Sequence, residues 1–181
     1  MKPISSIQLF CLCHFSKPTE DRLIYKTIRA QRCSSILEVG LGDGTRAERM
    51  LRVAQKFSVN KTLRYTGVDF FEGRENGQPK LPLRQVYKQL TSPSVKVQLV
   101  PGDLLSALSR IANSHTRTDL VLISAGQDPE TLAQCWFYFP RMLHAGSQVL
   151  VQDAPGQSFQ VLSRLQIEKM AQQTSPRRSA A

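Results

Sequence analysis

The segment Glu38–Thr45, with the sequence EVGLGDGT, has the residue types of a ligand-binding turn. It follows an apolar run and precedes an amphipathic stretch, so its glycines would stand between a strand and a helix. Glycines let the backbone turn sharply and approach a ligand closely, and the start of the next helix supplies free N–H groups. The spacing is GxGxG rather than GxGxxG, and no GK[ST] follows. The segment therefore differs from both the dinucleotide fingerprint and the P-loop.

Acidic side chains lie in and around this turn and after two later apolar runs. Glu38 and Asp43 belong to the turn and would repel a pyrophosphate, which favours a nucleoside carrying an ammonium group over a dinucleotide. Asp69 ends the run LRYTGVD, and Asp103 follows VQLVPG at the start of a helical stretch. Each feature also has an ordinary structural interpretation: a tight turn without ligand, an Asp that caps its own turn, and a helix N-cap.

The elements that must position these residues alternate along the chain. Short apolar runs predict strands at 35–40, 63–69, 95–100, 119–123 and 148–152. Amphipathic stretches predict helices at 19–31, 46–57, 84–90, 104–112, 130–143 with a break at Pro140, and 158–172. Alternating strands and helices with right-handed crossovers predict an α/β fold, a three-layer αβα sandwich with a doubly wound, mainly parallel sheet. Ligands of such sheets bind at the carboxyl ends of the strands.

The motif ILEVGLGDGT resembles the first motif of the class I S-adenosylmethionine-dependent methyltransferases, an acid followed by GxGxG. The resemblance extends over about residues 19–151 and implies a Rossmann-like fold with S-adenosylmethionine as cofactor. In that family the glycine turn packs against the methionine part, the acid ending the second strand holds the ribose hydroxyls, and an acid after the third strand lies near the adenine amino group. The cofactor-binding residues it implies are Glu38, Gly40, Gly42, Gly44, Asp69 and Asp103.

The chain departs from this family after the fourth strand, which normally supplies catalysis or substrate contact. Ile123–Glu130 looks most like the small-molecule O-methyltransferases, but Ser124 replaces the expected Asp, Ala125 follows it, and Gln127 stands where His would be. No catalytic residue is assigned, and we expect no metal site, because Asp153 is interpreted as a loop acid. The last two strands of the family sheet are expected to be missing, and an uncovered sheet edge favours a homodimer.

The 181 residues correspond to about one domain. We predict a leader at 1–18, for which a secretory signal is an alternative, a methyltransferase-like domain at 19–172 and a disordered basic tail at 173–181. The net charge of +10 attracts polyanions, but it is spread along the chain and no motif supports nucleic-acid binding. No apolar run is long enough to span a membrane. Four cysteines suggest reduced thiols in a cytoplasmic protein, with Cys33 and Cys135 packing as small hydrophobic residues.

Together these observations predict methyl transfer from S-adenosylmethionine to an unassigned, small-molecule acceptor. The altered segment after the fourth strand leaves a second hypothesis open, a non-catalytic, methyltransferase-like binding or regulatory module. A third is another α/β nucleotide binder, against which the GxGxG spacing and Glu38 both count.

Overall fold

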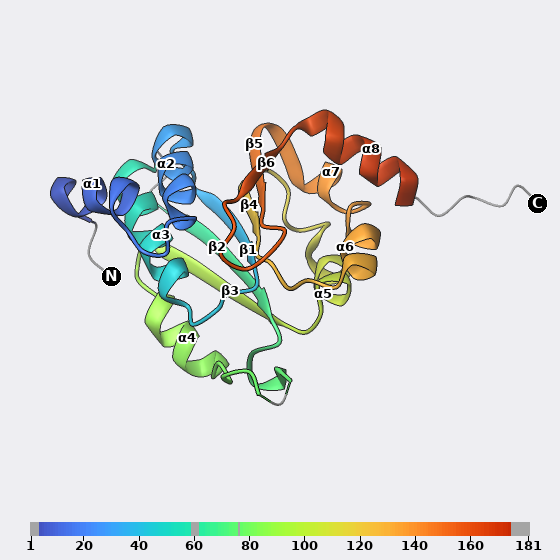
Figure 1. The fold of residues 1–181 in the computed structure, drawn as a ribbon, viewed down its shortest axis with the longest axis horizontal. Helices are drawn as coiled ribbons and strands as arrows, with labels where there is room; N and C mark the ends of the chain where they lie inside the picture. Colours follow the sequence, from blue (N-terminus) through green and yellow to red (C-terminus); the bar gives the residue numbers. More distant parts are fainter. Residues whose placement is uncertain (1–3, 59–61, 76, 175–181) are drawn as a thin grey trace, which may run out of the picture.

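A six-stranded sheet forms the centre of the molecule (Figure 1). The computed structural model describes residues 4–58, 62–75 and 77–174. The strand order is β3-β2-β1-β4-β5-β6, and all pairs are parallel except β5 with β6. The strands are β1 (Ser35–Val39), β2 (Leu63–Asp69), β3 (Val95–Pro101), β4 (Thr118–Ile123), β5 (Leu143–Val151) and β6 (Gln160–Leu162). All five residues of β1 are buried, as expected for a central strand of a parallel sheet.

Helices cover both faces of this sheet (Figure 1). They are α1 (Ser6–His14), α2 (Asp21–Gln31), α3 (Thr45–Phe57), α4 (Leu83–Leu90), α5 (Leu104–Ile111), α6 (Pro129–Cys135), α7 (Phe139–Met142) and α8 (Arg164–Thr174), with a 3₁₀ turn η1 at Phe71–Gly73. Helices α1 to α4 share one hydrophobic cluster with one face of the sheet, and α5 to α8 share a second cluster with the other face. The predicted three-layer αβα architecture is confirmed.

The end of the chain differs from the prediction of a sheet without its last two strands. Residues 160–162 form β6, antiparallel to β5, and the helix expected at 158–172 begins only at Arg164 as α8. A strand of three residues is too short to show the alternation that identifies strands in a sequence. Gly146 lies inside β5, where the pairing with β4 is irregular.

The helix predicted at 130–143 is two helices. It breaks at residues 136–138, before Pro140 rather than at it, because Pro140 lies in the first turn of α7. Proline is tolerated there, since the N–H it lacks would have no partner inside the helix. Cys33 and Cys135 are fully buried among hydrophobic residues, and burial raises the pKa of each thiol to about 12. Both pack as predicted.

The predicted leader contains a helix that contacts the domain. Helix α1 has a capping box at Ser5 and Gln8, and Leu9 and Cys13 are buried in the same cluster as α2 and α3. The predicted tail at 173–181 lies outside the described residues from residue 175 onward. In the part of the chain that the structure describes, no helix combines the length and the apolar character needed to cross a membrane.

Gly67 on β2 provides a test of how the sheet supports the glycine turn. A Cβ at this position would lie 3.1 Å from both methyl groups of Leu41 and 3.2 Å from one of Leu99. Because Leu41 is 1% exposed and cannot move aside freely, we expect Gly67→Ala to lower the free energy of unfolding by about 1 kcal/mol. This strain outweighs the gain from a stiffer unfolded chain.

Urea denaturation measures the difference, with Gly73→Ala as the matched control. A Cβ on Gly73 meets nothing within 4 Å, so this variant should stay within about 0.5 kcal/mol of the wild type. Equal stabilities of the two variants would show that the close packing of Leu41 against Gly67 leaves room for a methyl group, contrary to this prediction.

Candidate functional site

The connection from β1 to α3 is a tight glycine turn at the point where the strand order reverses. Gly40, Gly42 and Gly44 have φ angles of +77°, +64° and +83°, a region that favours glycine. The Asp43 carboxylate accepts hydrogen bonds from the N–H and hydroxyl of Thr45, at 2.9 and 2.8 Å, and so fixes the turn to α3. Open α/β sheets bind their ligands outside this reversal point, between β1 and β4 here.

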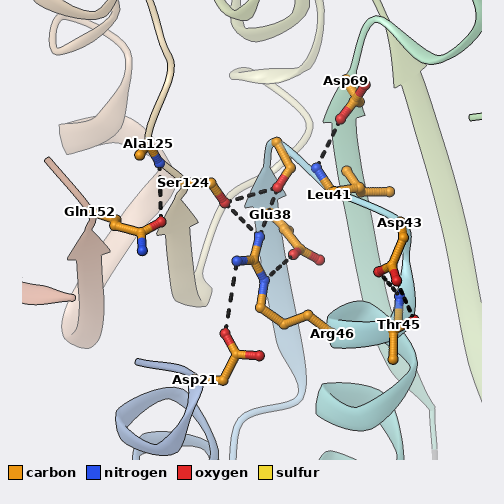
Figure 2. A network of polar contacts seen from close by, with 12 residues as sticks. Asp21, Glu38, Leu41, Asp43, Thr45, Arg46, Asp69, Ser124, Ala125 and Gln152 are labelled. Carbon is orange, nitrogen blue, oxygen red and sulfur yellow. Dashed lines mark hydrogen bonds and ion pairs between the residues drawn. The ribbon is translucent and has the colours of Figure 1, made fainter. Parts of the chain in front are cut away.

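Asp69, at the end of β2, is attached to this turn. Its Oδ2 atom accepts a hydrogen bond from the Leu41 N–H at 2.9 Å (Figure 2). Its Oδ1 atom accepts one from the Phe71 N–H at 3.0 Å. The acid and the glycine turn therefore form one hydrogen-bonded unit.

Arg74, in the loop after η1, binds the same carboxylate with two N–H groups. Its Nε donates to Oδ1 and its Nη2 to Oδ2, both at 2.7 Å, and Nη2 also donates to the Gly42 carbonyl. A carboxylate has about four acceptor positions, and four donors reach Asp69. Burial raises the pKa of Asp69, but the hydrogen bonds from Arg74, Phe71 and Leu41 outweigh it and place the pKa below its usual value.

Arg46, in the first turn of α3, occupies the reversal point between β1 and β4 (Figure 2). Its Nη2 donates to the Gly40 carbonyl at 2.7 Å and to the Ser124 hydroxyl, and Ser124 itself donates to the Gly40 carbonyl at 2.8 Å. Its guanidinium carbon lies 5.7 Å from the centre of the Phe159 ring. The guanidinium thus connects the glycine turn to the end of β4.

Glu38 is fully buried beneath the turn and pairs with Arg46. Its Oε1 accepts from Arg46 Nε at 2.8 Å and its Oε2 accepts from the Tyr65 hydroxyl at 2.6 Å. Asp21, 2% exposed, lies 3.9 Å from Arg46 Nη1. Burial raises the pKa of Glu38 and of Asp21, although Arg46 opposes the rise at both. Two buried carboxylates therefore share one guanidinium.

Asp103 lies at the end of β3, beside Asp69. Its side chain is the N-cap of α5, accepting from the Ser106 N–H at 2.9 Å, and the Gly102 N–H donates to the Asp69 carbonyl at 3.0 Å. The N-cap interpretation of Asp103 is confirmed. Its half-exposed carboxylate remains at the same edge as the glycine turn.

The loop after β4 packs against the glycine turn. A Cβ on Gly40 would lie 3.1 Å from Ser124 Cβ and 3.2 Å from Gln127 Nε2, whereas one on Gly42 would meet nothing within 4 Å. Asp153 accepts a hydrogen bond from Gln160 at 2.8 Å. Among the described residues, no three His, Cys, Asp or Glu side chains gather where they could hold a metal ion.

The fold brings the predicted glycines, Asp69 and Asp103 to one edge of the sheet and places Glu38 below it. Sequence reasoning missed Arg46 and Arg74, whose guanidinium groups pair with two of the three predicted acids. Three acids near one expected pocket were a signal that a nearby cation could pair with them, but nothing in the sequence identified which arginines.

Comparisons with known proteins show the fold. No family model and no curated protein matches the chain. Among solved structures, an O-methyltransferase from Bacillus cereus in complex with S-adenosylhomocysteine has a TM-score of 0.56 at 16% identity over 82% of this chain. A putative caffeoyl-CoA O-methyltransferase from Staphylococcus aureus has a TM-score of 0.55 at 14% identity over 93% of this chain. MnmC2 from Aquifex aeolicus has a TM-score of 0.53 at 15% identity over 83% of this chain.

The chain spans 50% of the length of MnmC2, 66% of the Bacillus cereus enzyme and 80% of the Staphylococcus aureus protein. It is structurally similar to class I S-adenosylmethionine-dependent O-methyltransferases, with low sequence identity. The antiparallel last strand and the strand order found here belong to this Rossmann-like methyltransferase fold.

The buried pair of carboxylates predicts a pH-dependent defect when Arg46 is removed. We expect Arg46→Met to lower the free energy of unfolding by about 3–5 kcal/mol at neutral or higher pH, because Glu38 and Asp21 lose their shared cation. Their pKa values then rise further above the unfolded values, so the folded state binds more protons and the defect shrinks as the pH falls.

Urea denaturation at about pH 8 and about pH 5.5 checks this sign. Arg84→Met, at an exposed position of α4, is the control and should show no such difference. If Arg46→Met does not fold at the higher pH, the double variant Glu38→Gln, Arg46→Met should recover part of the stability. A loss of equal size at both pH values would contradict the shared buried charge.

Proposed function

We propose that the chain binds S-adenosylmethionine at the carboxyl ends of β1 to β3 and transfers its methyl group to a small-molecule acceptor. In this proposal Gly40, Gly42 and Gly44 pack against the methionine part, Asp69 accepts the ribose hydroxyls and Asp103 lies near the adenine. Glu38 would act on the cofactor only through Arg46, which it pairs with and which holds the Gly40 carbonyl. The similarity of the fold to O-methyltransferases supports the proposal.

The observation that carries it is the two-pronged contact of Arg74 with Asp69. The guanidinium donates two N–H groups, each at 2.7 Å, one to each carboxylate oxygen. The neighbouring hydroxyls of a ribose offer two donors to the same pair of oxygens. In this proposal the Arg74 guanidinium occupies the positions that the two ribose hydroxyls would take, which supports Asp69 as their acceptor.

Cofactor binding then requires Arg74 to leave Asp69, because the carboxylate has no acceptor position left. Arg74 belongs to the loop between η1 and α4, so its side chain can move without disturbing a strand. The cationic nucleoside would replace both the charge and the two donors that Arg74 supplies. The observed affinity would be reduced by the small fraction of molecules in which Arg74 has moved.

S-adenosylmethionine supplies, when bound, a methyl group already activated on a positively charged sulfonium. The protein then has to orient the acceptor and exclude water, and it needs no metal or covalent intermediate for this. Ser124 and Gln127 are half-buried side chains beside Gly40, and neither can act as a base near neutral pH. We propose that they position the acceptor through hydrogen bonds.

A second candidate is a non-catalytic module with the same fold. The contact among Arg46, Ser124 and the Gly40 carbonyl favours it, because these groups fill the reversal point beside the place proposed for the methionine part. Arg46 cannot move as Arg74 can, since Glu38 would remain buried without a cation. The two candidates differ in methyl transfer, and a chain that does not bind the cofactor at all would leave only the second.

Substitution of the two residues of the Asp69–Arg74 pair separates the candidates. We expect Arg74→Ala to tighten S-adenosylmethionine binding by about tenfold, because it removes the competing donor. We expect Asp69→Asn to weaken binding by about 10- to 100-fold, since a charged acceptor is lost. Arg84→Ala, an exposed arginine of α4, should leave affinity unchanged. Calorimetric titration with S-adenosylmethionine and S-adenosylhomocysteine, with NAD as control ligand, measures these changes.

If neither the wild type nor Arg74→Ala binds S-adenosylmethionine or S-adenosylhomocysteine, the methyltransferase proposal is overturned and the non-catalytic module remains. Thermal unfolding of each variant verifies that it is folded before titration. If the cofactor binds, transfer of a radiolabelled methyl group to a panel of hydroxylated small molecules tests the second half of the proposal.

A further inference from the structure

A hollow of about 290 Å³ lies at the opposite end of the sheet from the glycine turn. Its lining includes Ser35, Arg64, Thr66, Lys96, Gln98 and His115, from the beginnings of β1, β2 and β3 and the segment after α5. No carboxylate is among its lining residues. The proposed cofactor site uses none of these residues.

The hollow exists because α5 covers only part of this face of the sheet. Alternate residues of a strand share one face, so Arg64 and Thr66 lie on the same face as Val68, and Lys96 and Gln98 on the same face as Val100. Helix α5 packs on the two valines within the second hydrophobic cluster and ends at Ile111. Nearer the beginnings of the strands, Arg64, Lys96 and Gln98 are exposed, whereas Thr66 is buried.

Two cations lie side by side in this hollow. Arg64 and Lys96 are direct partners in the parallel register of β2 and β3, and Thr66 and Gln98 are partners in the next row on this face. Like charges at directly paired positions destabilise a sheet. Within the described residues neither Arg64 nor Lys96 forms an ion pair. An anion between them would relieve this repulsion.

Asp119, near the start of β4 on the far side of β1, is already engaged. One oxygen of Asp119 accepts from the N–H groups of Ser34 and Ser35, at 2.7 and 2.9 Å, and the other pairs with His144 at 2.9 Å. Its hydrogen bonds fix it beside the start of β1. It therefore leaves the charge of Arg64 and Lys96 available to a ligand.

His115 adds a polar wall to the hollow without adding charge. Its Nδ1 lies 3.1 Å from the Ile111 carbonyl, which can only accept, so Nδ1 carries the proton. Its Nε2 therefore accepts from the Thr66 hydroxyl at 2.7 Å. Burial lowers the pKa of His115, so the ring is neutral at pH 7. The cationic surface of the hollow comes from Arg64 and Lys96.

We infer that this hollow binds a phosphate group, as free phosphate or as a phosphomonoester, between Arg64 and Lys96. The Arg64 guanidinium would bind two phosphate oxygens, Lys96 would supply a second positive charge, and Gln98 a neutral N–H donor. A confined pair of cations with neutral polar neighbours suits a compact dianion. A single-stranded nucleic acid would need a basic groove with aromatic side chains spaced over several nucleotides.

Two-dimensional ¹H–¹⁵N NMR of the full chain, titrated with inorganic phosphate at low salt and pH 7, tests the inference. We expect saturable shifts of the backbone amides at 64–66, 96–98 and 115. The double variant Arg64→Gln, Lys96→Gln should weaken binding at least about tenfold. The control Arg84→Gln, Lys88→Gln removes the same charge from exposed positions of α4, on the other face of the sheet, and should bind phosphate as the wild type does.

A parallel titration with adenosine monophosphate distinguishes free phosphate from a phosphomonoester, since the phosphomonoester should bind more tightly if the hollow also accepts its sugar. Equal weakening in both double variants, or shifts scattered over the surface, would overturn the inference, because only net charge would then matter. Saturable binding of an RNA of about 12 nucleotides without binding of phosphate would also overturn it. Asp69→Asn should leave phosphate binding unchanged, so failure of the cofactor proposal would not be mistaken for failure here.

Discussion

The half-buried guanidinium of Arg46 makes the contacts on which the carboxyl-end edge of the sheet depends. It pairs with Glu38, lies near Asp21, and donates to the Gly40 carbonyl and to Ser124, so that one side chain connects β1, β4, α2 and α3. A cation placed among buried carboxylates cannot be removed without leaving them unpaired. The path of the glycine turn and the position of the loop after β4 both follow from keeping Arg46 in place.

This constraint divides the candidate site into two unequal parts. Around Gly40, the polar groups are held by Arg46 and Ser124, and a change there would expose the pair of carboxylates beneath. Around Asp69, the occupying group is Arg74, which comes from a loop, and without it the carboxylate would still accept two backbone N–H groups. The nucleoside of the proposed function would therefore bind at the Asp69 part at a lower free-energy cost than at the Gly40 part.

The sequence predicted the features that local pattern encodes. The bounds of β2, the glycine turn with its positive φ angles and the N-cap at Asp103 all rest on periodicity or on residue types with a local effect. It did not predict β6, whose three residues are too few to show a period, or the buried pairing of Glu38. From the sequence alone, arginines in the first turn of a helix and in a polar loop are expected to be solvent-exposed. Their long side chains reach partners that are distant in sequence, so residue spacing does not predict these contacts. The acids and glycines of the candidate site were therefore named from the sequence, whereas the arginines that pair with these acids were not.

Charge is arranged in opposite ways at the two ends of the sheet. At the carboxyl ends of the strands, Arg46 and Arg74 each pair with an acid, so a nucleoside cation meets carboxylates already neutralised by the chain. At the beginnings of β2 and β3, Arg64 and Lys96 are neighbours and form no ion pair among the described residues. Because a ligand gains most where the protein has not already satisfied its charges, an anion needs no rearrangement to bind at this second end. Under the proposed function, a nucleoside at the first end would have to displace Arg74, so its binding would be coupled to the conformation of the loop after β2.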